Sequence, residues 1–196
     1  IDQSITLTGN GPLNTILSGG NSTRIIEVTD GAAINFTGIT FTNGLAAING
    51  GALQVSATLP LTTTVTVINC VFENNEAQGA MAIQGGGAIH NSGGATLDIQ
   101  SSSFENNSAS GAAGSGGAIL NSPGSILFVT ANTSFTNNIS NRAGGAIEDN
   151  SGTDFATIIS DATFTNNITN TSPGNGGGIH ITGPGDMLVS NSTFSG

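Results

Sequence analysis

The sequence predicts an all-β fold, a single-stranded right-handed parallel β-helix with about six to seven rungs of about 30 residues. A motif that begins with phenylalanine recurs six times, at spacings of 31, 32, 31, 29 and 30 residues. A motif of paired glycines recurs five times between its copies. Each repeat also contains short apolar alternations and no helical period, which is typical of short strands. A long repeat of this kind indicates a solenoid whose rungs share one continuous core.

The phenylalanine motif reads FTNG, FENN, FENN, FTNN, FTNN and finally FSG along the chain. We expect the aromatic rings to stack inside the solenoid and the asparagines to form a hydrogen-bonded ladder at one corner, as identical side chains do in stacked rungs. Gly44 replaces the asparagine in the first copy. The predicted structural residues are Phe41, Phe72, Phe104, Phe135, Phe164 and Phe194, with Asn75, Asn107, Asn138 and Asn167.

The glycine motif reads GGAL, GGAI, GGAI, GGAI and GGGI. A glycine pair permits a tight turn because it has no Cβ atoms, so we expect each pair to lead into a strand. The segments between the asparagine and the glycines vary in length, which predicts surface loops on one side. The predicted structural glycines are Gly50, Gly51, Gly86, Gly87, Gly116, Gly117, Gly144, Gly145, Gly176 and Gly177.

The side chains that precede each phenylalanine indicate a corner between two strands. Counted back from each phenylalanine, mostly apolar residues lie at the odd offsets seven and five. The phenylalanine itself and the mostly small residue two before it lie at even offsets. One continuous strand cannot point both sets inward. The position three before the phenylalanine holds Gly, Asn, Ser or Asp, which tolerate turn geometry. The two columns expected to point inward are Ile34, Val65, Leu97, Phe128, Thr157, Met187 and Phe36, Val67, Ile99, Thr130, Ile159, Val189.

Each rung is therefore predicted to hold three short strands, for example 96–100, 102–105 and 118–121. The chain is expected to form one domain over residues 1–196, with a degenerate N-terminal rung at 1–33 and the regular repeats at 34–196.

Composition excludes several partners. The chain has twelve acidic residues and only two basic ones, Arg24 and Arg142, which gives a formal net charge of -10. It has no lysine. Nucleic-acid binding and polybasic attraction to membranes both need clustered cations. The apolar runs are too short to insert this segment into a membrane. One cysteine, Cys70, and two histidines, His90 and His180, exclude an internal disulfide and a paired-cysteine zinc site, and no cofactor is expected.

The alternating Phe-x-x-Asn and Gly-Gly-Ala-[Ile/Leu/Val] tetrapeptides resemble the repeats of the chlamydial polymorphic membrane proteins. More broadly, they are similar to bacterial secreted right-handed β-helix proteins. The resemblance covers about residues 35–196. It implies an extracellular or cell-surface passenger, often adhesive, with a surface ligand on a host or neighbouring cell as its partner.

Other β-helix proteins cleave polysaccharides, so a glycan-active enzyme is an alternative. Such sites need neighbouring carboxylates, or Ca²⁺ with a basic residue. The best candidates are Glu148, Asp149 and Asp154, near Arg142, which also form a weak Ca²⁺ candidate. Solvated loop acids are the simpler interpretation, and the absence of lysine, tyrosine and tryptophan favours a protein that is not an enzyme.

One column of residues follows the glycine motifs: Gln54, His90, Leu120, Glu148 and His180. It should point outward, and Glu148 and His180 should be rung neighbours, for which a surface ion pair or no interaction is favoured over a metal or catalytic pair. Cys70 is expected to be a buried, inert thiol.

Two outer surfaces are candidates for function. Hydroxyl pairs flank several of the phenylalanines and resemble the ice-matching face of antifreeze proteins, although Val71, Glu73, Ser103 and Glu105 interrupt them. The hydroxyl pairs are Thr40 and Thr42, Ser134 and Thr136, Thr163 and Thr165, and Thr193 and Ser195. The second surface is apolar, and contiguous exposed apolar area is typical of an interface. It is predicted to consist of Leu127, Val129, Ile158 and Leu188.

Neither end of the sequence shows a capping helix or polar cap. An open rung exposes unpaired backbone, which predicts either a segment of a longer passenger or copies that stack end to end into a filament. The sequence thus favours a non-catalytic, secreted or surface-displayed β-helix with a structural or adhesive role. A self-assembling filament, an ice-binding protein and a glycan-active enzyme are the alternatives.

Overall fold

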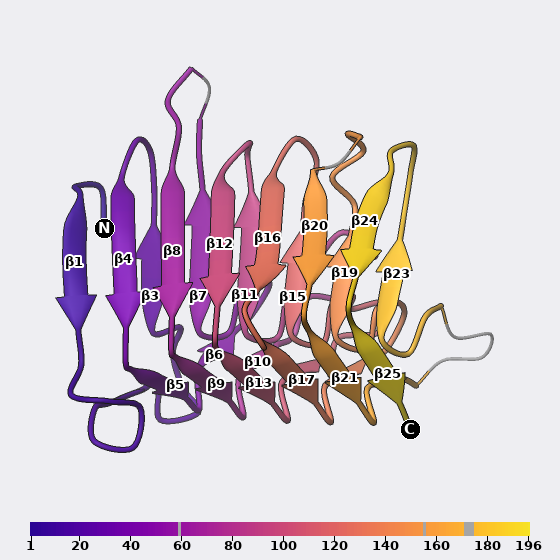
Figure 1. The fold of residues 1–196 in the computed structure, drawn as a ribbon, viewed down its shortest axis with the longest axis horizontal. Helices are drawn as coiled ribbons and strands as arrows, with labels where there is room; N and C mark the ends of the chain where they lie inside the picture. The colour runs from indigo at the N-terminus through magenta and orange to yellow at the C-terminus, as the bar shows by residue number, and fades with distance from the viewer. Residues whose placement is uncertain (59, 155, 171–174) are drawn as a thin grey trace.

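A computed structural model describes residues 1–58, 60–154, 156–170 and 175–196. Its strands wind into stacked rungs that pair in parallel, and they progress from the N-terminus at the left of Figure 1 to the C-terminus at the right. Two sheets hold seven strands and a third holds six, so the chain makes six turns and starts a seventh, as predicted. No helix of the described residues has the length and apolar character needed to cross a membrane.

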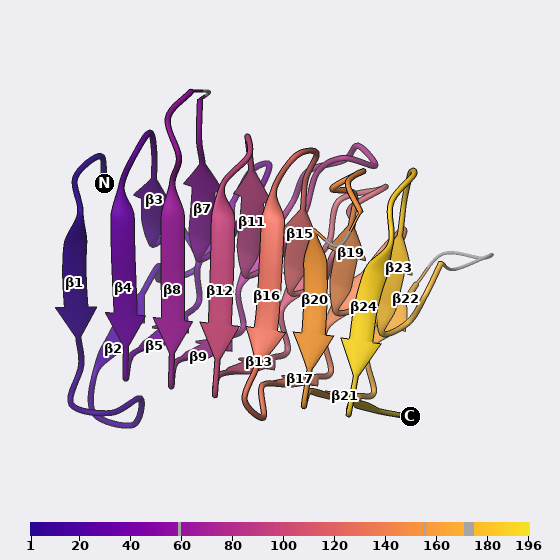
Figure 2. The same ribbon diagram turned by 45° about the horizontal axis from the view of Figure 1, so that its top comes forward.

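Sheet A forms the front of the molecule in Figures 1 and 2. Its strands, in spatial order, are β1 (Ile5–Thr8), β4 (Ala33–Thr37), β8 (Thr64–Ile68), β12 (Thr96–Gln100), β16 (Ile126–Thr130), β20 (Thr157–Ser160) and β24 (Met187–Ser190). Sheet B carries the phenylalanine motif. Its strands are β2 (Ile16–Ser18), β5 (Thr40–Thr42), β9 (Val71–Glu73), β13 (Ser103–Glu105), β17 (Ser134–Thr136), β21 (Thr163–Thr165) and β25 (Thr193–Ser195).

Sheet C follows the glycine pairs and lies behind sheet A (Figure 2). Its strands are β3 (Ile26–Val28), β7 (Leu53–Ser56), β11 (Ile89–Ser92), β15 (Ile119–Asn121), β19 (Ile147–Asp149) and β23 (Ile179–Ile181). The structure adds a fourth sheet, D, of two-residue strands between B and C. Its strands are β6 (Leu45–Ala46), β10 (Glu76–Ala77), β14 (Ser108–Ala109), β18 (Ile139–Ser140) and β22 (Ile168–Thr169).

The corner between sheets A and B lies where the sequence predicts it. The residue three positions before each phenylalanine has a positive φ in all six copies, which reverses the direction of the side chains. Glycine, asparagine and aspartate adopt this conformation at low cost. The six corner residues are Gly38, Asn69, Ser101, Asn132, Asp161 and Asn191.

The rung of Phe135 contains one extra corner residue. Ala131 and Asn132 both have positive φ, at 57° and 63°. The extra residue shifts β16 by one position, so that Leu127 pairs with Leu97 of β12 and Phe128 pairs with Asp98. Because side chains alternate along a strand, the shift reverses every side chain of β16.

Two predictions for this rung are therefore wrong. Leu127 and Val129, expected outside, are fully buried in the core. Phe128 and Thr130, expected inside, are partly exposed on the outer face.

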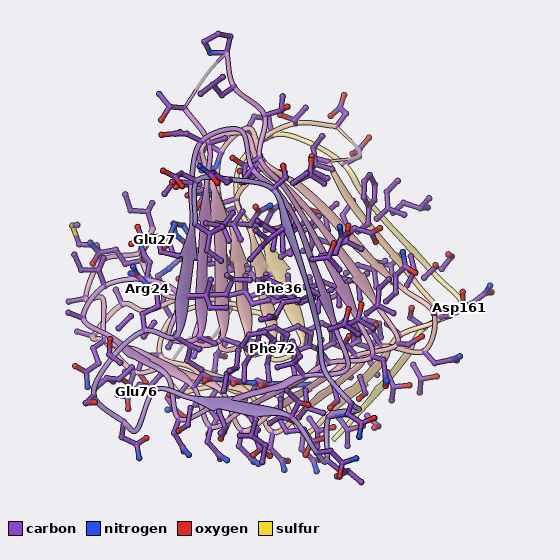
Figure 3. All side chains as sticks on the ribbon, turned by 90° about the vertical axis from the view of Figure 1, so that its left-hand side faces the viewer. Arg24, Glu27, Phe36, Phe72, Glu76 and Asp161 are labelled. Atoms are coloured by element: carbon purple, nitrogen blue, oxygen red, sulfur yellow. The ribbon has the colours of Figure 1, made fainter. Side chains whose placement is uncertain are left out.

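The phenylalanines form one continuous stack inside the solenoid. Neighbouring ring centroids from Phe41 to Phe194 lie 4.7, 4.9, 4.9, 4.8 and 4.6 Å apart, with interplanar angles of 3° to 11°. This distance is close to the spacing of hydrogen-bonded strands, about 4.8 Å, so the backbone ladder sets the ring separation. In the view along the solenoid, Phe36 and Phe72 lie in the interior, whereas Glu76 and Asp161 lie at the periphery (Figure 3).

The asparagines of the motif form a buried ladder parallel to this stack. The Nδ2 group of Asn107 donates to Oδ1 of Asn138 at 2.9 Å, and Asn75 donates in the same way to Asn107 at 3.0 Å. Each Nδ2 group also donates to the carbonyl oxygen of the phenylalanine one rung before, as Asn107 does to Phe72 at 2.9 Å. Each Oδ1 also accepts from the backbone N–H at the motif position one rung before, which is Gly44 for Asn75 and an asparagine for the others, so the ladder joins side chain and backbone.

The two glycines of each pair have different roles. Gly116 has a φ of +66° and makes the turn into β15. Gly117 has no positive φ, but a Cβ atom on it would lie only 2.0 Å from the carbonyl oxygen of Gly145 one rung away. The second glycine is therefore required by the close approach of neighbouring rungs rather than by the turn itself.

Candidate functional site

The outer face of sheet C carries the most concentrated set of ionisable side chains. The column predicted to point outward runs in register from Gln54 through His90, Leu120 and Glu148 to His180. Its members are nevertheless largely buried. The segments before the glycine pairs also stack on one another, since Gly85, Ser115, Ala143 and Asn175 form successive parallel bridges.

Glu148 is the centre of this face and is fully buried. Its Oε1 accepts from Nη2 of Arg142 at 2.8 Å and from Oγ1 of Thr182, and its Oε2 accepts from Nδ1 of His180 at 2.8 Å. Glu148 and His180 are in contact as predicted, but the contact is part of a buried network rather than an isolated surface pair. A buried carboxylate is tolerated only when charged and hydrogen-bonding groups compensate it in this way.

Arg142 links this network to two loops. Its Nε donates to Oγ of Ser115 at 2.8 Å, and its Nη2 also donates to the carbonyl oxygen of Ala82 at 3.3 Å. The guanidinium thus joins loops from different rungs to Glu148. Since both carboxylate oxygens are occupied by partners on the protein, the arrangement serves to hold rungs and loops together.

The structure does not bring together the three acids of the weak Ca²⁺ candidate, Glu148, Asp149 and Asp154. Glu148 and Asp149 are consecutive on β19, so Glu148 points outward and Asp149 points into the solenoid. Asp149 accepts from Nδ2 of Asn121 at 3.1 Å, and Asp154 lies exposed in the loop that follows. Among the residues that the structure describes, no group of three acidic, histidine or cysteine side chains has a geometry that could hold a metal ion.

Sequence reasoning missed a second internal ladder, formed by Asn91, Asn121 and Asp149. The Nδ2 group of Asn91 donates to Oδ1 of Asn121 at 2.9 Å, and Asn121 donates in turn to Asp149. The signal for it is an amide or acid two residues after the Ile of three successive glycine motifs. This ladder explains why polar side chains replace the apolar Val28 and Val55 at the same inward position of sheet C.

His90 is a satisfied buried histidine. Its Nδ1 lies 2.9 Å from Oε1 of Gln54, and its Nε2 lies 2.7 Å from Oγ of Ser122. Gln54 donates through its Nε2 to Ser92, so its Oε1 accepts from His90 Nδ1–H and the hydroxyl of Ser122 donates to Nε2. Burial, and secondarily the positive charge of Arg24, lower the pKa of His90 from 6.5 to about 4.

The lowered pKa predicts that stability depends on pH. Between pH 6.5 and about 4 the unfolded chain binds a proton at His90 and the folded chain does not. The contribution of His90 is therefore complete above pH 6.5 and falls by about 1.4 kcal/mol per pH unit as the pH falls through this range. Urea unfolding at several pH values should show this slope, and His90→Gln should remove it. A variant that keeps the wild-type slope would contradict the assignment.

Cys70 lies in the small inward column of sheet B and is 2% exposed. Burial raises the pKa of its thiol above the ordinary 9.0. Ser102 and Thr133 continue this column and bind the backbone of the corner: Ser102 Oγ donates to the carbonyl oxygen of Gln100 at 2.8 Å. Small polar residues at this position therefore hold the turn between sheets A and B.

The hydroxyl columns on sheet B do not form one open array. Thr40 and Thr42 are buried, and Thr40 Oγ1 donates to the carbonyl oxygen of Pro12 at 2.7 Å. In the next two rungs Glu73 and Glu105 are direct neighbours in the ladder. Apart from this buried pair, hydroxyl residues occupy both outward positions only in the last three rungs.

The outer face of sheet A carries an apolar strip over its last three strands, and we call Ile126, Phe128, Ile158 and Leu188 the sheet A strip. Phe128, Ile158 and Leu188 are successive neighbours in the ladder. Leu188 is 47% exposed, and Ile126, Phe128 and Ile158 are partly exposed. The predicted patch is thus half right, because Ile158 and Leu188 lie on this face and Phe128 replaces Leu127 and Val129.

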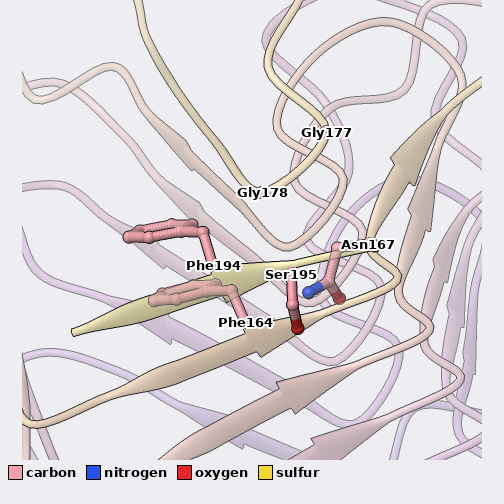
Figure 4. A pocket seen from close by; sticks show the side chains of 7 residues that line it. Phe164, Asn167, Gly177, Gly178, Phe194 and Ser195 are labelled. Carbon is pink, nitrogen blue, oxygen red and sulfur yellow. The ribbon is translucent and has the colours of Figure 1, made fainter.

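A hollow of about 370 Å³ lies beside the last rings of the phenylalanine stack. Figure 4 shows Phe164 and Phe194 stacked on one another, with Asn167 and Ser195 beside them. Gly177 and Gly178 form part of its wall. Among the residues that the structure describes, its lining side chains are uncharged.

The fold and these contacts define a parallel β-helix repeat protein in which most polar motif residues hold one rung to the next. Three stretches, residues 69–96, 101–122 and 132–148, match the model of the Chlamydia polymorphic membrane protein repeat. The chain therefore carries repeats like those of the polymorphic membrane proteins in this part of the sequence, and the match indicates a surface or secreted location. Neither the curated proteins nor the solved structures include a significant match to the chain.

Proposed function

We propose that this chain is a non-catalytic, adhesive segment of a surface or secreted protein, and that it binds another macromolecule through the sheet A strip. The observation that carries the proposal is the placement of Phe128 and Ile158 as direct neighbours on an outer face. The equivalent positions of the earlier rungs hold Thr6, Asn35 and Thr66, which suit exposure to water. Apolar neighbours on a solvent-exposed sheet are typical of an interaction surface.

The absence of catalysis is supported by how the acidic residues are used. General acid–base chemistry on a glycan needs two carboxyl groups that face one space. Glu148 is saturated by Arg142, His180 and Thr182, and Asp149 faces the opposite side of the same strand. Two of the three candidate acids, Glu148 and Asp149, thus serve structural contacts.

Adhesion can be tested with microspheres coated with the chain and passed over surfaces of defined extracellular proteins and glycans. We expect retention on at least one surface, and we expect the double variant Phe128→Thr/Ile158→Thr to reduce it at least about tenfold, because it removes the central apolar contacts while keeping residues that favour strands. The matched control is Ile68→Thr, which changes a partly exposed apolar residue of β8 outside the strip. Equal retention of the double variant and the wild type would contradict the proposal.

A further inference from the structure

The sheet A strip is bordered by acidic side chains on several sides. Asp98 precedes Phe128 in the same column, one rung away. Asp161 is exposed at the corner where the strand of Ile158 ends, and Asp186 is exposed two residues before Leu188. An apolar centre with a rim of one sign of charge is a pattern that selects partners of the opposite sign.

No cation of the described residues lies on sheet A, and the two arginines of the chain are bound elsewhere. Arg24 forms an ion pair with Glu27 at 3.3 Å and donates to the carbonyl oxygens of Asn49 and Gly50. Arg142 is held by Glu148 on the face of sheet C. The negative charges around the strip therefore have no cationic neighbour on their own face.

The dimensions of the strip fit a short segment of secondary structure. Phe128, Ile158 and Leu188 occupy three successive rungs, which span about 10 Å at a strand spacing of about 4.8 Å. Ile126 lies two residues before Phe128 on β16 and extends the strip by about 7 Å along the strand. Two turns of an amphipathic helix, about 11 Å long, would cover it.

From this arrangement we propose that the partner of the sheet A strip is a basic amphipathic segment of another protein, with apolar side chains on the strip and Lys or Arg residues opposite Asp98, Asp161 and Asp186. This inference rests on the proposed function and adds the chemistry of the partner. A second copy of the chain is disfavoured because each copy carries a net charge of -10 and would present the same acids. An anionic membrane is disfavoured for the same reason.

Fluorescently labelled amphipathic model peptides test the proposal: one with leucine and lysine, one in which glutamine replaces every lysine, and one in which glutamate does. We expect fluorescence anisotropy to show that the lysine peptide binds at least about tenfold more tightly than the glutamine peptide at low salt, and that about 150 mM salt reduces the difference. The glutamate peptide should not bind. Equal binding of the lysine and glutamine peptides would overturn the inference.

Two pairs of charge variants separate the strip from the general acidity of the protein. Asp98→Asn/Asp161→Asn should weaken binding of the lysine peptide about fivefold, whereas Glu73→Gln/Glu105→Gln on sheet B removes the same charge and should leave it nearly unchanged. If both pairs weaken binding equally, the attraction is nonspecific and the inference fails.

The apolar variants distinguish this failure from failure of the proposed function. Phe128→Thr/Ile158→Thr should abolish binding of the lysine peptide, with Ile68→Thr as the unaffected control. If binding depends on the strip but not on the charges, the proposed function stands and only the nature of the partner is wrong. If the strip variant binds like the wild type, both are wrong. Dimers that dissociate on the strip substitutions, seen by analytical ultracentrifugation, would make a second copy the partner and overturn the basic segment.

Discussion

Gly117→Ala is expected to destabilise the solenoid by about 4 kcal/mol or more. The new Cβ atom would lie 2.0 Å from the carbonyl oxygen of Gly145 and 2.6 Å from the backbone nitrogen of Ile139. Both contacts are with backbone atoms, which no change of rotamer can relieve. The neighbouring rungs would have to separate, and this would stretch the ladder hydrogen bonds on either side. Denaturant unfolding followed by circular dichroism measures the loss.

The matched control is Gly124→Ala. Gly124 has a φ of +75°, but a Cβ atom on it would meet no atom within 4 Å. Its substitution should cost only about 1 kcal/mol, the strain of a left-handed alanine. A loss at Gly117 as small as that at Gly124 would show that the rungs separate easily, and it would contradict the role assigned to the second glycine.

The Gly-Gly motif to which Gly117 belongs also shows how much the sequence can predict. The repeat predicts a turn at each Gly-Gly, because glycine is the residue that turns require. The reason for the second glycine depends on the distance between a backbone atom and the next rung, about 30 residues away in sequence. Such a distance becomes known only when the register of the ladder is fixed in three dimensions.

For the candidate site as well, the sequence predicts the local feature, the corner between sheets A and B, but not all of the residues that are exposed. Its position follows from the offsets of apolar residues, and it is correct in every rung because the constraint is local. The prediction fails in the rung of Phe135 because residues 126–129 are apolar at consecutive positions, so either alternation could face the core. The extra residue at Ala131 decides between them, and it exposes Phe128 instead of Leu127.

Burial of the outward column on sheet C could not be predicted by periodicity alone. Alternation indicates which side of a strand a residue faces, but not whether a loop covers that side. Here the loop of Arg142 closes over Glu148, and the next rung supplies His180 and Thr182. A carboxylate expected to be a solvated loop acid is thus fully buried and has three polar partners.

In the asparagine ladder, Asn107→Ala should lower the free energy of unfolding by about 3 to 5 kcal/mol. The substitution removes the Oδ1 atom that accepts from both the backbone N–H and the Nδ2 group of Asn75. It also removes the donor to the carbonyl oxygen of Phe72 and to Oδ1 of Asn138. All these groups are buried, so water cannot replace the lost partner without opening the corner.

Asn170→Ala is the control that separates a ladder asparagine from one at the surface. Asn170 is exposed, and within the described part of the chain its Nδ2 donates to Oδ1 of Asn141 alone, at 3.1 Å, so its loss should change the free energy of unfolding by no more than about 0.5 kcal/mol. Gly44 gives a natural reference for the broken ladder, because its backbone N–H donates to Oδ1 of Asn75 and no side chain continues the column beyond it. An interior gap at position 107 differs from this natural end, since it leaves polar groups unpaired on both sides. If Asn107→Ala were as mild as Asn170→Ala, the stacked phenylalanines and the backbone ladder alone would hold the rungs, and the asparagine of each repeat would need another explanation.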